Sequence, residues 1–294
     1  MKTGYRPTER KELKRHLLFL FVFVCTVSKT HGQVLSPFEL FNRMITAIEN
    51  TKTCSYSFVG EDRIDEELKY SELLVRLQPK PLKAYIYSIK PNPGTKALFV
   101  EGENNNKILI DPNSFPYINL NFSPYHSIMR SQHHFTLYET GFEYVKTVML
   151  YYYQKDSAAF VKALSGGNEV TYKNSNYYQV NVDQPGFAYV KYTVLPGENL
   201  VTIAKKLFVN DDMIRLANPV IDGFDDVKAG QVIRVPNGFA KKVIFLLDKT
   251  NFLPLVQEMY DEKGLYGRYT FSSFIWNPVF SPDEFTKGKK EYGF

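Results

Sequence analysis

The segment from Tyr192 to Pro236 constrains the fold of this chain more tightly than any other part of its 294 residues. Two glycine turns, Pro196-Gly197 and Ala229-Gly230, bracket a stretch in which apolar residues recur at helical spacing. These residues form the faces of two successive helices, Leu200, Ile203, Ala204 and Leu207 in the first and Ile214 and Ala217 in the second. With an N-cap at Asp211 or Asp212 and a strand at either end, the segment is predicted to form a βααβ unit.

The landmarks of this segment resemble those of the LysM domain over residues 190–236. Pro196-Gly197-Glu198-Asn199-Leu200, the Ile203-Ala204 helix, Asn218-Pro219 and Gly230-Gln231 stand in the LysM order. The resemblance implies binding to peptidoglycan or a chitin-like glycan through N-acetylglucosamine units. The implied groove lies between the loop after the first strand and the loop after the second helix. Its glycan-binding residues are then Pro196, Gly197, Glu198, Asn199, Leu200, Asn218, Pro219, Val220 and Ile221.

The chemistry of these two loops suits a sugar ligand. Backbone amide and carbonyl groups can pair with acetamido groups, while Pro219, Val220 and Ile221 are expected to pack on sugar faces. Two departures from the LysM pattern bear on the groove: Asn199 stands where Thr or Ser is frequent, and residues 222–226 form an acidic loop that disfavours anionic glycans. The alternative is a LysM scaffold kept only as an interaction or structural module, because a fold does not ensure a function.

Residues 1–32 have the layout of a secretory signal peptide. A basic stretch ends at Arg15, Leu17–Val27 is apolar and uncharged, and Thr30-His31-Gly32 precedes the expected cleavage before Gln33. The apolar run is short for a membrane span, and an uncleaved anchor is the alternative. No later stretch is long and apolar enough to cross a bilayer, so we expect an exported protein of the periplasm or cell envelope with no membrane span after cleavage.

The charge and the cysteine content exclude several classes of function. The formal net charge of +5 comes from residues 1–32, which hold seven Lys or Arg residues and two Glu residues, so the remainder is neutral overall and is not expected to bind nucleic acid. Only Cys54 remains after signal cleavage, which rules out an internal disulfide and a cysteine-rich zinc site. No cofactor and no metal are predicted.

The remaining residues alternate as in an antiparallel sheet. Ser36 is predicted to cap a helix over 37–50, with Pro37 at its first position and Glu39 closing a capping box. Alternation then begins at Cys54-Ser55-Tyr56 and recurs in short runs separated by polar or Pro/Gly turns, which indicates a meander of hairpins. Strand patterns return over 243–247, 255–260 and 269–275, with a turn at 261–264.

The stretch between the meander and the LysM-like segment is more irregular. Three prolines interrupt residues 112–124, and helical spacing resumes from Phe142 to Tyr152. A short helix is predicted from an N-cap at Asp156 to Gly166-Gly167, followed by a hairpin over 172–182. The predicted class is therefore α+β, a curved antiparallel sheet with helices on one face. The sheet domain comprises residues 33–188 and 238–294, interrupted by a LysM module at 189–237.

The end of the chain carries a second resemblance. Asp248-Lys249-Thr250 followed by Pro254, and then Tyr260-Asp261-Glu262-Lys263-Gly264, is similar to the end of periplasmic lipoprotein-carrier and lipoprotein-sensor domains. This likeness implies a half-barrel-like sheet with helices across its concave face and a cavity that binds an acyl chain or a lipoprotein. The residues around Gln132-His133-His134 and Gly141-Phe142 also resemble an uncharacterised bacterial envelope family.

The candidates for catalysis are few. His133 and His134 are adjacent, and on a strand they would point to opposite faces, so one packed and one solvated histidine is expected rather than a shared metal. Cys54 sits in an alternating run, where it is expected to pack as a small apolar group. No Gly-x-Ser-x-Gly, phosphate-loop or His-Glu-x-x-His motif is present.

We therefore predict an exported, non-catalytic binding protein. The LysM module would attach it to peptidoglycan or a related glycan, and the sheet domain would engage a hydrophobic ligand or an envelope partner. Two alternatives stay open: a cell-wall hydrolase that uses Cys54 with His126, His133 or His134, and a purely structural envelope scaffold.

Overall fold

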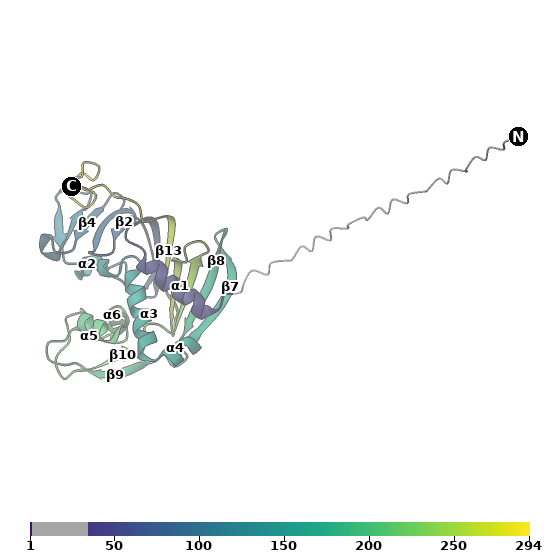
Figure 1. Cartoon of the computed structure of the whole chain (residues 1–294). Helices are drawn as coiled ribbons and strands as arrows, with labels where there is room; N and C mark the ends of the chain where they lie inside the picture. The colour runs from purple at the N-terminus through teal and green to yellow at the C-terminus, as the bar shows by residue number, and fades with distance from the viewer. Residues whose placement is uncertain (2–34) are drawn as a thin grey trace. The chain divides into compact units, whose positions relative to one another are not determined.

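The computed structural model describes residues 35–294 together with Met1. The predicted signal peptide lies, apart from Met1, outside the described residues. Residues 34–294 form one compact unit, and most of it is a single antiparallel sheet (Figure 1). No helix within residues 35–294 is long and apolar enough to span a membrane.

The sheet has eleven strands in the order β6-β5-β4-β3-β2-β1-β13-β12-β11-β8-β7. Each strand lies antiparallel to its neighbours, so the predicted α+β class with an antiparallel meander is confirmed. The strands are β1 (Cys54–Ile64), β2 (Glu67–Gln78), β3 (Lys83–Lys90), β4 (Lys96–Val100), β5 (Ile108–Asp111), β6 (Leu120–Phe122), β7 (Leu164–Tyr172), β8 (Ser175–Asp183), β11 (Lys242–Asp248), β12 (Pro254–Asp261) and β13 (Gly264–Trp276).

The first and last strands of the sheet lie side by side. β1 pairs with β13 in a register that sets Phe58 opposite Phe271, so residues more than two hundred positions apart meet in the middle of the sheet. The late strand patterns in the sequence thus complete the sheet that the early ones begin.

Helices cover one face of this sheet (Figure 1). The helical elements outside residues 189–237 are α1 (Pro37–Glu49), α2 (Ser127–Arg130), α3 (Glu143–Lys155), α4 (Ser157–Ala163) and the 3-10 turns η1 (Asn104–Asn106) and η2 (Leu137–Glu139). Ser36 Oγ accepts a hydrogen bond from Glu39 N at 3.1 Å, which confirms the predicted N-cap. The predicted capping box does not form, because the Glu39 carboxylate pairs with Arg43 instead. The predicted apolar face of α1 is buried, and each such side chain contributes roughly 1.5–3 kcal/mol.

Residues 189–237 form a small unit that we call the inserted module. It contains β9 (Tyr189–Thr193), α5 (Leu200–Leu207), α6 (Asp211–Leu216) and β10 (Val232–Pro236), which are the predicted βααβ elements. β9 and β10 make their own two-stranded sheet, and the module has its own apolar core. Because β8 and β11 are neighbours in the large sheet, the module is inserted between two adjacent strands.

Three further local predictions were wrong. α4 ends before Gly166-Gly167, because both glycines take positive φ within β7 and form a bulge against β8. The N-cap of α6 is Asn210 rather than Asp211 or Asp212, since the Asn210 side chain accepts from Met213 N at 3.0 Å. His133 and His134 lie in the loop between α2 and η2 rather than on a strand.

The C-terminal residues 277–294 pack on the sheet in a way that no sequence pattern predicted. The Tyr292 ring stacks on Tyr85 with centroids 3.6 Å apart, and Arg76 donates to Glu284 at 2.8 Å. Along β3 the side chain of Tyr85 points to the opposite face from Ala84 and Ile86. The terminal segment therefore covers the face of the sheet away from the helices.

Glu284 makes the attachment of this segment sensitive to acid. Burial alone would raise the pKa of its carboxyl, but hydrogen bonds from Tyr292, Lys289 and Ser281 outweigh burial and lower the pKa to about 2. Because the folded pKa is depressed, the stabilisation is fully present above the ordinary value of 4.5 and is lost as the pH falls through about 2.

The variant Glu284→Gln is therefore expected to melt at a lower temperature than the parent protein at pH 7, and the difference should shrink towards pH 2. Thermal unfolding of both proteins at pH 7, 4 and 2 measures it. A difference that stays constant with pH would contradict the assigned role of the carboxylate.

Candidate ligand cavity

A cavity of about 710 Å³ lies between the helix-covered face of the sheet and the segment 127–145. The sheet supplies most of its wall from the inward positions of β1–β5 and β11–β13, and the side chains there are mainly apolar. Representative wall residues are Tyr56, Phe58, Val75, Ile86, Ile110 and Met259. The alternation that defines these strands thus places one row of side chains in the cavity.

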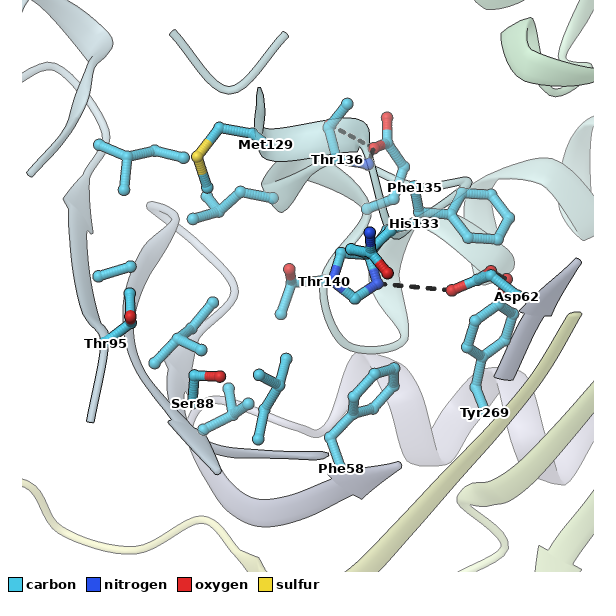
Figure 2. A pocket seen from close by; sticks show the side chains of 18 of the residues that line it. Phe58, Asp62, Ser88, Thr95, Met129, His133, Phe135, Thr136, Thr140 and Tyr269 are labelled. Atoms are coloured by element: carbon cyan, nitrogen blue, oxygen red, sulfur yellow. Dashed lines mark hydrogen bonds and ion pairs between the residues drawn. The ribbon is translucent and has the colours of Figure 1, made fainter. Parts of the chain in front are cut away.

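Residues 127–141, which we call the roof segment, close the cavity opposite the sheet. Figure 2 shows Met129, His133 and Phe135 directed into the cavity from this segment. Local hydrogen bonds shape it: Thr136 N donates to Glu139 Oε2 at 2.6 Å, and the Thr136 side chain caps η2. Burial raises the pKa of the Glu139 carboxyl, against the opposing effect of these bonds from Thr136.

One polar cluster interrupts the apolar lining. Asp62 of β1 is 1% exposed, and its Oδ1 accepts a hydrogen bond from the Tyr269 hydroxyl at 2.5 Å. His133 Nδ1 lies 3.5 Å from Asp62 Oδ2 (Figure 2). Burial and the charge of Asp62 raise the pKa of Tyr269 well above its ordinary value, so this hydroxyl stays protonated and donates.

The cavity opens to solvent at its other side. Most lining residues of the β3–β4 and β5–β6 loops are exposed, as is Ile128 of α2. Phe115, Tyr117 and Ile118 of the β5–β6 loop are also exposed, Phe115 by 87%. Figure 2 places Thr95 at one side of the cavity and Asp62 at the other, so the polar cluster is remote from the opening.

Contacts with the inserted module hold the roof segment in place. Arg130 pairs with both carboxylate oxygens of Asp211, at 3.0 and 2.5 Å, and its guanidinium lies 3.5 Å from the ring centroid of Phe224. His134 Nδ1 is 2.7 Å from Asp212 Oδ2, and its ring stacks on Tyr266 at 3.7 Å. The two acids at the start of α6 are thus partners of the roof segment.

The two adjacent histidines therefore lie in different environments. His133 faces the cavity and Asp62, whereas His134 is 1% exposed and is enclosed by Asp212 and Tyr266. Within residues 35–294 no group of three metal-binding side chains gathers. The expected packed histidine is His134, whereas His133 is half-buried in the cavity rather than solvated, and loop geometry rather than strand alternation separates the two.

Cys54 lies in the core of the sheet. Its side chain is 1% exposed, and burial raises the pKa of its thiol to about 12. It does not line the cavity. A thiolate is therefore strongly disfavoured at neutral pH at this position, and the packing role expected for Cys54 accounts for its surroundings.

The structure divides the nine predicted glycan-binding residues into exposed and buried ones. Exposed or partly exposed residues are Pro196, Gly197, Glu198, Asn199, Pro219 and Val220, whereas Leu200, Asn218 and Ile221 are buried. Leu200 and Ile221 belong to the core of the module, so the prediction that Ile221 packs on a sugar face is wrong. Asn218 hydrogen-bonds Ile214 O and both backbone groups of Arg234, which makes it a structural brace.

The loop after β9 contacts residues 224–225 of the loop after α6, which lie outside the predicted groove residues 218–221. Asn199 Nδ2 donates to Asp225 Oδ1 at 2.7 Å, and Leu200 N donates to Phe224 O at 2.9 Å. Glu198 accepts from Tyr192, Lys206 and Leu195 N and so fixes the turn in which Gly197 takes a φ of +80°. The exposed apolar residue at this site is Val220, at 88%.

Sequence reasoning missed Asp62, Tyr269 and Arg130. Of these three residues, Asp62 could have been noticed from the sequence, because it is a charged residue at an inward position of an alternating strand. Nothing local marks Tyr269 or Arg130, whose partners lie 207 and 81 residues away in the chain.

Residues 52–189 match the family model described as "Protein of unknown function (DUF1571)". The match includes Gln132-His133-His134 and Gly141-Phe142, and it ends where the inserted module begins, so the LysM assignment stays a prediction. No curated protein matches this chain.

Several solved structures are similar to this chain in fold alone. An uncharacterized conserved protein from Thermus thermophilus is 10% identical, with a TM-score of 0.39 over 87% of this chain and 95% of that one. Lipoprotein LppX from Mycobacterium tuberculosis is 9% identical, with a TM-score of 0.39 over 83% and 97%. A putative outer membrane lipoprotein-sorting protein domain from Vibrio parahaemolyticus is 10% identical, with a TM-score of 0.34 over 86% and 96%. At this level of identity no ligand or activity transfers from these proteins to this chain.

Proposed function

We propose that this protein binds an elongated apolar ligand, such as the acyl chain of a lipid or lipoprotein, in the cavity beneath the roof segment. The observation that carries the proposal is the cavity itself. Its volume of about 710 Å³ falls within the roughly 300–1,000 Å³ typical of small-molecule sites, and its wall is mainly apolar. A core of this size would ordinarily be filled with side chains, because protein interiors pack closely.

Binding without catalysis is the simplest chemistry for this site. Asp62 and His133 provide a carboxylate and an imidazole, but Cys54, the nucleophile of the hydrolase alternative, lies outside the cavity lining with a pKa of about 12. The predicted signal peptide supports the same proposal, since an exported carrier in the periplasm or cell envelope would meet acyl chains there.

Filling the cavity tests the proposal. Ala97 of β4 lines the cavity, so the variant Ala97→Trp places a large ring in it. We expect the displacement of a bound neutral dye, N-phenyl-1-naphthylamine, by acyl compounds to weaken by about tenfold or more, equivalent to about 1.4 kcal/mol. The matched control is Ala158→Trp on the exposed side of α4, which should bind like the parent protein. Equal binding by Ala97→Trp and the parent would overturn the proposal.

A second function, glycan binding by the inserted module, is favoured by the contact between its two loops. The Asn199–Asp225 hydrogen bond joins the loop after β9 to the loop after α6, and Pro219 and Val220 of the latter loop are exposed. We propose that these loops bind N-acetylglucosamine units of peptidoglycan or chitin.

Co-sedimentation with insoluble peptidoglycan and with chitin tests this second proposal. The protein lacking residues 1–32 is expected to sediment with at least one polymer, and Val220→Asp should reduce the bound fraction several-fold without unfolding the module, because Val220 is 88% exposed. Lys173→Asp, in the β7–β8 turn of the large sheet, is the control. If the parent protein sediments with neither polymer, the module is a scaffold.

A further inference from the structure

We propose that the cavity selects neutral amphiphiles that carry a hydrogen-bond donor, such as acyl alcohols or acyl amides, and discriminates against fatty-acid anions. This inference rests on the proposed binding function and specifies the class of ligand. It follows from the Asp62–Tyr269–His133 cluster and from the charges around the cavity.

The lining offers no permanently charged cation to an anion. Among the described residues that line the cavity there is no lysine and no arginine, and the acids that line it are Asp62 and Glu139. Arg130, the cation of the roof segment, is 6% exposed and is engaged by Asp211. A fatty-acid carboxylate taken into this cavity would lose its hydration without gaining an ion pair, and an unpaired buried charge is costly.

Asp62 instead accepts hydrogen bonds and has capacity for another. A carboxylate offers about four lone-pair sites. Tyr269 uses one on Oδ1, and His133 Nδ1 stands 3.5 Å from Oδ2, longer than an ordinary hydrogen bond. A ligand hydroxyl or amide N–H lying beside these two groups would donate to Oδ2, a charge-assisted bond that a carboxylate ligand cannot make.

The aromatic surroundings strengthen this discrimination. The rings of Phe58 and Phe135 lie with their centroids 6.0 and 5.5 Å from that of Tyr269, so the cluster sits in an apolar environment. At low local dielectric both the attraction between Asp62 and a donor and its repulsion of a second carboxylate increase. The opening lies on the other side of the cavity from Asp62 (Figure 2), and the Asp62 side chain is 2% exposed, whereas that of His133 is 28% exposed.

A matched pair of ligands tests the inference. The protein lacking residues 1–32 is titrated at pH 8 with 1-decanol and with decanoate, each displacing N-phenyl-1-naphthylamine; at this pH the carboxylate is ionised. Decanol is expected to bind about tenfold more tightly than decanoate, or better. In Asp62→Asn the ratio should fall to about threefold or less, since the repelling charge is gone.

The controls separate this inference from the proposed function. Ser88→Ala removes a different polar group of the cavity wall and should keep the parent's preference. If Asp62→Asn does not fold, the ratio of decanol affinity to decanoate affinity in the parent protein is sufficient to test the inference. Decanoate binding as tightly as decanol overturns the selectivity but leaves the cavity a binding site, whereas failure of both ligands and of the dye to bind overturns the proposed function itself.

Discussion

Replacing Arg130 with alanine is expected to lower the free energy of unfolding by about 3–5 kcal/mol, the cost of breaking a buried ion pair by removing one partner. The Arg130 side chain is 3% exposed and that of Asp211 is 12% exposed, so the variant leaves a carboxylate largely without water and without its counter-ion. The same change removes the guanidinium from the face of Phe224. Denaturant unfolding of the parent and the variant measures the difference.

An exposed ion pair provides the comparison. Lys263 and Glu66 are paired at 2.5 Å with exposed fractions of 64% and 68%, so Lys263→Ala should leave the free energy of unfolding nearly unchanged. If Arg130→Ala is as mild as Lys263→Ala, the contact between the roof segment and the inserted module does not stabilise the protein. A large loss for Arg130→Ala alone identifies this contact as the support of the cavity roof.

Much of the fold could be predicted because local patterns determine it. α1 follows from the Ser36 cap and one apolar stripe, and the hairpins follow from two-residue alternation between turns. The βααβ elements of the inserted module follow from glycine turns and helical spacing. Each of these sequence patterns involves residues close together in the chain, and the folded structure contains the element that each pattern predicts.

The cavity could not be predicted in the same way. Whether an inward row of apolar side chains meets a helix or an empty space depends on segments far apart in the sequence, as β1 and β13 show. The choice of Asn210 as the cap of α6 has the same origin. Asp211 and Asp212 are equally good caps by composition, but Arg130 and His134 engage them. Tertiary partners therefore decided which of three capping residues is used.

Asn210 gives the second large expected effect, because one side chain serves three buried partners. Its Oδ1 accepts from Met213 N at 3.0 Å and from the Tyr266 hydroxyl at 2.8 Å, and its Nδ2 donates to His134 O at 3.2 Å. Asn210 is 3% exposed and Tyr266 is fully buried, so water cannot replace the lost bonds. Asn210→Ala is expected to cost about 2–4 kcal/mol, as each buried polar group left unpaired costs about 1–3 kcal/mol before relaxation.

Asn199 is the control for this prediction, since it is also an asparagine N-cap with a second side-chain hydrogen bond but is only half-buried. Its Oδ1 accepts from Thr202 N at 2.8 Å and its Nδ2 donates to Asp225 at 2.7 Å. Asn199→Ala should cost about 1 kcal/mol, because water can reach the groups that the variant leaves unpaired. Denaturant unfolding of both variants compares the two caps directly. Equal losses would show that Asn210 only caps α6. A clearly larger loss for Asn210→Ala would show that Asn210 has a second role. Its bonds would then also hold the inserted module against Tyr266 of the sheet and against the loop that contains His133.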